Sequence, residues 1–254
     1  DAVHRSAAIW AMGEAAASFG FAAARIFDEL APLEDEKFKL YAAQGIRGRA
    51  EFKALKVKEE QAIEYIQLKA KDETASARYA ELDNDAIVKF IALDALANVL
   101  CPAVKLWNTG QGATVMREAV SLMGGYGITE DCPGFLGQKW MDMQLEATYE
   151  GPEAVQRRQL SLTLITPVFK AHFQAWIEEM KKIAENHPNT GAAALAAGME
   201  MWQFTQDYLQ TGKDMHGVKL WGSARQGITF PMADAFSWLA ASHQQILDVV
   251  ELAE

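Results

Sequence analysis

The order of apolar and polar residues along this chain predicts helices and no strands. Ala, Glu, Lys, Leu, Gln and Met, which are strong helix formers, dominate between the prolines. No stretch alternates β-branched residues with polar ones, as a half-buried strand requires. The pattern therefore predicts an all-α fold.

Prolines, glycines and turn-forming pairs set the expected ends of the helices. Asp83 or Asp85 is expected to cap a helix in which Ile87, Phe90 and Ile91 follow helical spacing. The segment 108–113, with two glycines, is expected to form a turn. The helices that we predict cover residues 5–30, 34–71, from 83 or 85 onward, 113–123, 135–145, 153–185, 192–210 and 230–253.

Charge argues against a nucleic-acid partner. The chain has 24 Lys and Arg against 34 Asp and Glu, a net charge of −10, so a phosphate backbone is repelled unless a basic patch is present. The densest basic stretch runs from Arg47 to Lys58 and is interleaved with Glu51. We interpret this stretch as a solvated helix face.

The two cysteines, Cys101 and Cys132, have no CxxC spacing and no Cys/His cluster, which argues against a metal site. Two thiols in a chain of this length favour a reducing compartment, and we expect a cytoplasmic protein. No apolar run approaches the roughly 20 residues that cross a bilayer, so no membrane span is expected. The start at Asp1, without an initiator Met, suggests a fragment or a processed subunit.

The pattern changes between Gly124 and Pro152, where six glycines interrupt the helical periodicity. The run Gly124-Gly125-Tyr126-Gly127 is read most simply as a helix end with a tight turn. The alternative interpretation is that the backbone of this run approaches a bulky ligand closely, which a Cβ atom would prevent. Glu150 also has two interpretations. It is either an ordinary carboxylate in a solvated turn or, because Tyr149 precedes it and Gly151 and Pro152 follow it, a functional carboxylate.

Together these pieces resemble the C-terminal signature of acyl-CoA dehydrogenases: Gly-Gly-x-Gly, then Arg-Asp, Tyr-Glu-Gly-Thr and Ile-Gln-Arg. The matching positions are Gly124, Gly125, Gly127, Asp142, Tyr149, Glu150, Gly151, Val155, Gln156 and Arg157. The resemblance implies an up-and-down helical bundle in residues 1–166. It also implies a helical extension in residues 167–254, where the likeness is weaker.

The resemblance implies an oxidoreductase acting on CH–CH bonds, which removes the α-proton and β-hydride of an acyl-CoA thioester. Glu150 would be the catalytic base and FAD the hydride acceptor. The implied cofactor-binding residues are Gly124, Gly125, Gly127, Gly151 and Pro152, and the implied substrate-binding residues are Tyr126, Tyr149 and Gly151. The implied partners are acyl-CoA, an electron-transfer flavoprotein and further subunits in a homo- or hetero-oligomer, a dimer or tetramer.

Three positions depart from the family pattern: Ser121 replaces a Gln, Met141 an Arg and Pro152 a Thr. These changes remove an amide, a charge and a hydroxyl from the expected flavin surroundings. The alternative function is therefore a flavin-free partner subunit or an oligomerisation module of a heteromeric dehydrogenase. The family's N-terminal helical domain and β-barrel are not visible here, and we expect them in a longer chain or a partner subunit.

Tryptophans and methionines at helical spacing are more often core residues than cofactor contacts. We therefore expect the seven tryptophans to act mainly as packing anchors. Tyr126 and Trp140 are the exceptions, because both lie in the glycine-interrupted stretch and are candidates for lining an acyl pocket. The five histidines show no triad or ligand spacing and are expected to be structural.

Overall fold

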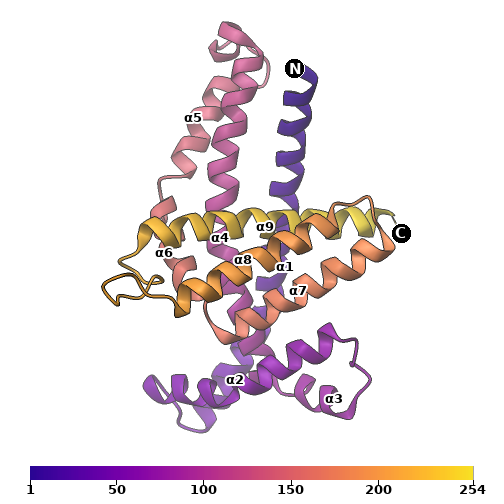
Figure 1. Cartoon of the computed structure of the whole chain (residues 1–254), viewed down its shortest axis with the longest axis vertical. Helices are drawn as coiled ribbons and strands as arrows, with labels where there is room; N and C mark the ends of the chain where they lie inside the picture. Colours follow the sequence, from indigo (N-terminus) through magenta and orange to yellow (C-terminus); the bar gives the residue numbers. More distant parts are fainter. Residues whose placement is uncertain (254) are drawn as a thin grey trace. The chain divides into compact units, whose positions relative to one another are not determined.

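The structure is a computed structural model that describes residues 1–253. Within them it is 80% helical and contains no strand, so the predicted all-α class is confirmed. Figure 1 shows the helices in chain order. They are α1 (Ala2–Ala43), α2 (Arg49–Ala70), α3 (Ala77–Asp83), α4 (Ala86–Leu122), the 3₁₀ turn η1 (Gly124–Ile128), α5 (Leu136–Glu146), α6 (Glu153–Thr163), α7 (Pro167–Asn186), α8 (Ala192–Thr211) and α9 (Gln226–Ala253).

Two predicted helix ends at prolines are wrong. Pro32 lies inside α1 and Pro102 lies inside α4. A proline in a helix interior costs about 3 kcal/mol, and burial of the neighbouring residues offsets this cost. Leu100, Ala103 and Leu106, on both sides of Pro102, are at most 4% exposed.

The turn predicted at residues 108–113 is also wrong, because α4 is continuous there. Gly110 and Gly112 serve close packing instead of a chain reversal. A Cβ on Gly112 would collide with the Met143 side chain of α5, and one on Gly110 would lie 3.2 Å from a carboxylate oxygen of Glu153. The glycines therefore admit other side chains against the α4 backbone.

The start of α4 follows capping chemistry. The carboxylate of Asp85 accepts hydrogen bonds from the backbone N–H groups of Ile87 (2.9 Å) and Val88 (3.2 Å), so Asp85 is the cap of α4. The helix predicted over 153–185 is interrupted after Thr163, and Pro167 begins α7 at a position where its missing N–H is harmless.

The chain divides into two compact units, each built from separate stretches. Unit 1 comprises residues 1–22, 101–161 and 198–254, and unit 2 comprises residues 23–100 and 162–197. These units do not follow the domain boundary expected between residues 166 and 167. That boundary stays a prediction about the extent of the bundle.

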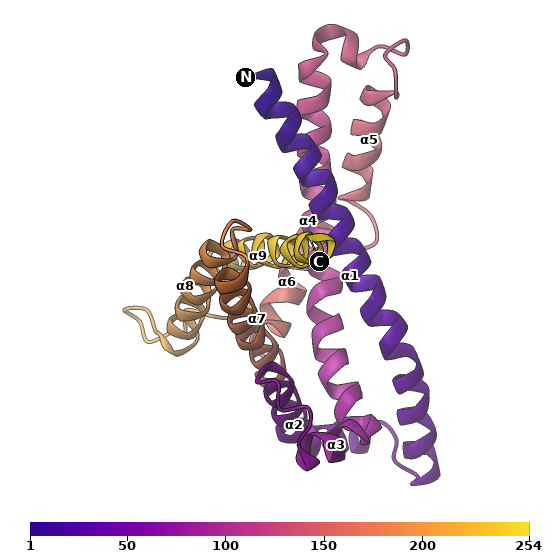
Figure 2. The same cartoon turned by 90° about the vertical axis from the view of Figure 1, so that its right-hand side faces the viewer.

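Unit 2 has its own apolar core, in which α2 packs against α7 (Figure 2). The core includes Leu30, Tyr41, Ala62, Ile66, Leu82, Ile87, Val88, Phe90 and Val168. Buried polar groups in this unit are satisfied. His172 shares a 2.9 Å hydrogen bond with the carbonyl of Ala92, and burial lowers its pKa to about 4.

Unit 1 is organised around aromatic residues. Trp107 is 3% exposed and makes edge contacts with Phe19 and Trp238 at centroid distances of 6.4 and 5.3 Å. Trp202 packs on Phe236 at 5.5 Å. Four tryptophans are buried as expected for packing anchors: Trp107, Trp176, Trp202 and Trp221. The expectation is wrong for Trp10, which is 73% exposed.

Two helices, α1 and α4, have the length and composition of a membrane span. The expectation that no stretch has these properties is therefore wrong. Each helix has a most apolar window of eighteen residues. In α4, 56% of this window is buried, and in α1 17% is buried. A mostly buried core helix passes the same test, so length and composition alone are weak evidence for a span.

Candidate functional site

Glu150 lies in the short loop that joins α5 to α6 in unit 1. Its backbone is left-handed, with φ of +48°, and Gly151 follows with φ of +101°. A non-glycine residue in this region is uncommon and points to a constrained backbone. The Glu150 side chain is exposed to solvent, so residues 1–253 do not provide the dry surroundings expected for a base.

The residues on both sides of Glu150 are held firmly. The Lys105 ammonium donates a 2.7 Å hydrogen bond to the carbonyl of Glu146, the last residue of α5, and lies 4.7 Å from the centre of the Tyr149 ring. The Tyr149 hydroxyl donates to the Glu146 carboxylate at 2.8 Å, and this bond raises the pKa of Tyr149. Tyr149 is therefore fixed to α4 and α5.

Gln156 holds the other side of the loop. Its side-chain amide donates a 2.9 Å hydrogen bond to the carbonyl of Gly151. A Cβ on Gly151 would displace that amide, and its φ of +101° is the constraint that favours glycine. Gln156, which the sequence identified only as a motif position, thus fixes the backbone next to Glu150.

Arg157 ties α6 to α9. Its guanidinium contacts Asp234 at 2.8 Å and Glu153 at 2.9 Å. Burial alone would lower the pKa of Arg157, but the hydrogen bonds to Asp234 and Glu153 raise it above its usual value. Because both carboxylates are within unit 1, this network positions α6, which begins directly after the Glu150 loop.

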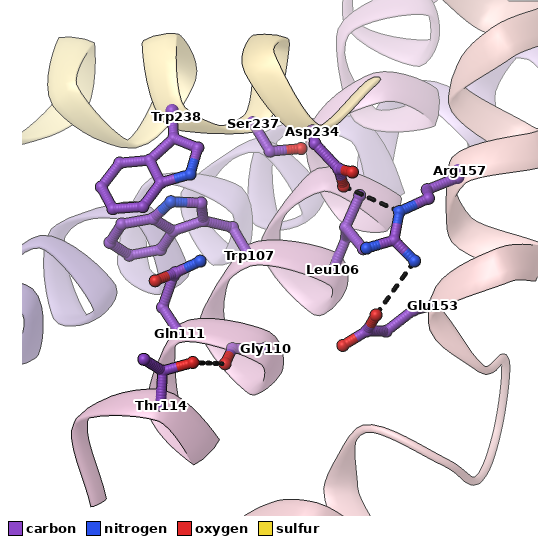
Figure 3. Close-up of a pocket in the computed structure, with 10 residues that line it drawn as sticks. All are labelled: Leu106, Trp107, Gly110, Gln111, Thr114, Glu153, Arg157, Asp234, Ser237 and Trp238. Atoms are coloured by element: carbon purple, nitrogen blue, oxygen red, sulfur yellow. Dashed lines mark hydrogen bonds and ion pairs between the residues drawn. The ribbon is translucent and has the colours of Figure 1, made fainter. Parts of the chain in front are cut away.

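A pocket of about 350 Å³ lies beside this network (Figure 3). Trp107 and Gln111 of α4 face Trp238 of α9 on one side, and Glu153, Arg157 and Asp234 lie on the other. The charged residues that line this pocket already pair with one another, Arg157 with Glu153 and with Asp234. Glu150 is not among the lining residues. The pocket is therefore not the predicted catalytic site.

The glycine-rich run forms η1, and its three glycines have different reasons to be glycine. Gly127 is buried, and a Cβ there would lie 2.5 Å from the carbonyl oxygen of Val120. Gly124 has φ of +61°. Gly125 has neither constraint, since its φ is not positive and no atom lies within 4 Å of its Cβ position. Its open side leaves room for a close approach from outside the chain.

The two aromatic candidates for an acyl pocket have different surroundings. Tyr126 is 47% exposed and its hydroxyl donates a 2.8 Å hydrogen bond to the carbonyl of Asp131, within the same loop. Trp140 is half-buried, and within residues 1–253 its buried indole N–H has no hydrogen-bond partner. A buried donor of this kind costs free energy unless it is paired.

The glycine run precedes α5 and Glu150 follows it, and Figure 1 shows the two segments that flank α5 at opposite ends of this helix. Gly137, near the start of α5, packs against Ile128 of η1, whereas Glu150 follows the end of the helix. Eleven helical residues span about 16 Å. The chain thus does not bring the two sets of predicted residues together, and a ligand that touches both must be long.

The residues at the three departures from the signature are all exposed. The Ser121 hydroxyl accepts a 2.9 Å hydrogen bond from Arg5 of α1, and Met141 is 70% exposed. Pro152 precedes α6 and accepts a 2.8 Å backbone hydrogen bond from Val155. Ser121 therefore has an intrachain role that its motif position did not predict.

Sequence reasoning missed Lys105 and Asp234. Lys105 lies 41 residues before its acceptor, and Asp234 lies 77 residues after Arg157. No local pattern marks either residue. A search for groups of His, Cys, Asp and Glu that could hold a metal ion finds none within residues 1–253.

Comparison with known proteins agrees with the motif resemblance. Residues 42–164 match the family model described as "Acyl-CoA dehydrogenase, C-terminal domain". The match supports the resemblance to the acyl-CoA dehydrogenase family over these residues, which include η1, α5 and the Glu150 loop. No curated protein and no solved structure matches the chain.

Proposed function

We propose that this chain provides the C-terminal part of the active site of a flavin-dependent acyl-CoA dehydrogenase. The observation that carries the proposal is the Glu150 loop, in which Tyr149 and Gly151 are fixed while Glu150 projects from a constrained backbone. A carboxylate whose neighbours are fixed, and which has no hydrogen-bond or ion-pair partner within residues 1–253, is free to contact a substrate.

In the proposed reaction the Glu150 carboxylate takes a proton from the α-carbon of an acyl-CoA thioester. FAD, when bound, supplies the acceptor for the β-hydride. A carboxylate acts as a stronger base where water is excluded. We propose that the acyl chain, the cofactor and protein segments beyond residues 1–253 cover Glu150.

The glycines fit the proposed cofactor in part. Gly125 has an open side that permits close approach of a dinucleotide, whereas Gly124 and Gly127 are also explained by intrachain geometry. Because η1 and the Glu150 loop are separated by α5, we propose that they engage different parts of FAD, or flavins of different subunits. Gly151 and Pro152 would lie beside the cofactor near Glu150.

We further propose that Tyr149 and Gly151 contact the thioester and that Tyr126 lies close to bound ligand. The expected partners follow from the family: acyl-CoA, an electron-transfer flavoprotein and further subunits in an oligomer. A cytoplasmic location remains our proposal.

A second candidate function is a flavin-free partner subunit of a heteromeric dehydrogenase. The exposure of Glu150 and the engagement of Ser121 by Arg5 favour this candidate. In such a subunit the Glu150 loop would retain its packing without performing chemistry.

The two candidates differ in flavin content. The complete protein would be purified and its flavin-to-subunit ratio read from the visible spectrum before and after addition of acyl-CoA. The catalytic proposal predicts one flavin for each copy of this chain and bleaching of the flavin band by substrate. A protein in which flavin is bound only by other subunits would support the second candidate and reject the first.

A further inference from the structure

The first turns of α2 in unit 2 carry an unusual surface, which we call the cationic face. It consists of Arg49, Phe52, Lys53, Lys56 and Val57, all of which are exposed. The three cations recur at spacings of four and three residues, so they share one side of the helix. Phe52 lies one turn from both Arg49 and Lys56, and Val57 lies one turn from Lys53.

The cations of this face are largely uncommitted. Among residues 1–253 no ion pair or side-chain hydrogen bond is found for Arg49 or Lys53, nor for Arg47 in the preceding turn. Lys56 pairs with Glu59 on the helix surface at 2.5 Å, an exposed contact of small energy. Some other cations of unit 2 are paired, such as Lys58 with Asp85 and Arg78 with Glu64.

The local charge opposes that of the whole chain. Residues 47–60 contain five cations and three acids, a net charge of +2, while the chain carries −10. Of the three acids, Glu51 is paired with Lys37 of α1 at 3.2 Å and Glu59 with Lys56, while Glu60 is exposed one turn from Lys56. An anionic partner is therefore attracted to this face and repelled by the chain as a whole.

Apolar side chains stand among these charges. Phe52 is 75% exposed and Val57 is 80% exposed, and Phe38, near the end of α1, is 71% exposed. A partner that matches the face must accept both cations and apolar groups. Phe52 and Val57 lie between its charges, so this face is amphipathic and not purely polar, as the solvated helix face favoured by the sequence would be.

We propose that the cationic face docks on the surface of an anionic lipid bilayer. Lys and Arg would pair with lipid phosphates while Phe52 and Val57 enter the boundary between headgroups and acyl chains. Val57 distinguishes this partner from single-stranded nucleic acid, because bases stack on aromatic rings and an aliphatic side chain offers no stacking surface.

The test is flotation of the full chain with vesicles. Vesicles of equal parts phosphatidylcholine and phosphatidylglycerol are expected to bind the protein, and vesicles of phosphatidylcholine alone are not. Binding is expected to weaken as salt is raised, because the contacts are exposed and screened. Absence of binding to the anionic vesicles at low salt overturns the proposal.

Matched variants locate the binding surface. Arg49→Gln, Lys53→Gln and Lys56→Gln together are expected to reduce vesicle affinity about 100-fold, since each cation near an anionic surface contributes about fivefold. The control variant is Lys69→Gln, Lys71→Gln and Lys139→Gln, which changes the net charge equally at exposed positions elsewhere. Equal loss in the two variants overturns the proposal, because it indicates nonspecific attraction.

A second pair of variants tests the apolar part. Phe52→Ser with Val57→Ser is expected to weaken binding about tenfold or more, since both side chains lose their burial in the bilayer. Met201→Ser with Phe204→Ser, two exposed residues of α8, is expected to leave binding unchanged. Binding of single-stranded DNA, or a change in oligomeric state that tracks the cationic face without vesicle binding, identifies another partner and rejects the lipid surface.

Discussion

The two ends of α5 offer a direct comparison, because both carry motif residues in an irregular segment of unit 1. At the start, two of the three glycines of η1 are explained by the chain itself, through the φ of Gly124 and the close contact of Gly127. At the end, Tyr149 and Gly151 are held by hydrogen bonds, but Glu150 contacts none of these holding groups.

The difference separates structural from functional reasons for a motif residue. Gly127, Gly151 and Gln156 have structural reasons within the chain: the close contact of Gly127 with Val120, the φ of Gly151 and the hydrogen bond of Gln156. Gly125 and Glu150 are not required by any described contact. Residues of the second kind are where the proposed ligand contacts belong, and the variants below distinguish the two kinds.

The largest effect is expected from Glu150→Gln in the complete protein. Loss of the base is expected to lower kcat by a factor of about 10² to 10⁴, with the fold and the flavin content unchanged. Steady-state dehydrogenation assays, circular dichroism and the visible spectrum measure the three quantities. The matched control is Glu130→Gln, another exposed carboxamide substitution in unit 1, for which kcat should not change; turnover retained by Glu150→Gln removes this residue from the role.

The next effect distinguishes two neighbouring glycines. Gly127→Ala is expected to lower the free energy of unfolding by about 1 to 3 kcal/mol, because the new Cβ meets the backbone of Val120. Gly125→Ala is expected to change it by less than about 0.5 kcal/mol. Urea denaturation of both variants provides the measurement.

In the flavin-loaded protein the order should reverse for cofactor affinity. Gly125→Ala is expected to weaken flavin binding about tenfold, because the added methyl group occupies the open side. Flavin release measured by fluorescence tests this expectation. Unchanged flavin affinity in Gly125→Ala would leave η1 with a structural role alone.

A smaller effect is expected from Lys105→Met. This change removes the hydrogen bond to Glu146 and the ammonium over the Tyr149 ring, and it should cost about 1 kcal/mol of stability. It should also lower kcat, because the Glu150 loop loses an anchor. Lys139→Met, at an exposed position on α5, is the control; identical behaviour of the two variants in both assays would deny Lys105 a positioning role.

The type of each element followed from sequence more reliably than its ends. Helix formers and apolar spacing predicted the helical class, and the two candidate caps Asp83 and Asp85 included the residue that starts α4, Asp85. Pro32, Pro102, Gly110 and Gly112 were misread because a local pattern cannot reveal tertiary packing. The chain accepts a proline or glycine inside a helix where burial offsets its cost or where another helix needs the space.

The site was predictable as a list of residues and not as an arrangement. The signature identified Glu150 and the glycines, and the family match covers them. It did not indicate that α5 separates them, nor that Lys105 and Asp234 support the loops, because these contacts join residues far apart in the chain. Their roles in binding and catalysis stay predictions.

The left-handed backbone of Glu150 places the proposed catalytic activity and the stability of the fold in opposition. A side chain at this φ costs about 1 to 2 kcal/mol that glycine would not, so Glu150→Gly is expected to raise the urea midpoint while abolishing the base. Glu130→Gly, where φ is not positive, should show no such gain. The residue proposed as the base is thus also a position at which the fold gives up stability.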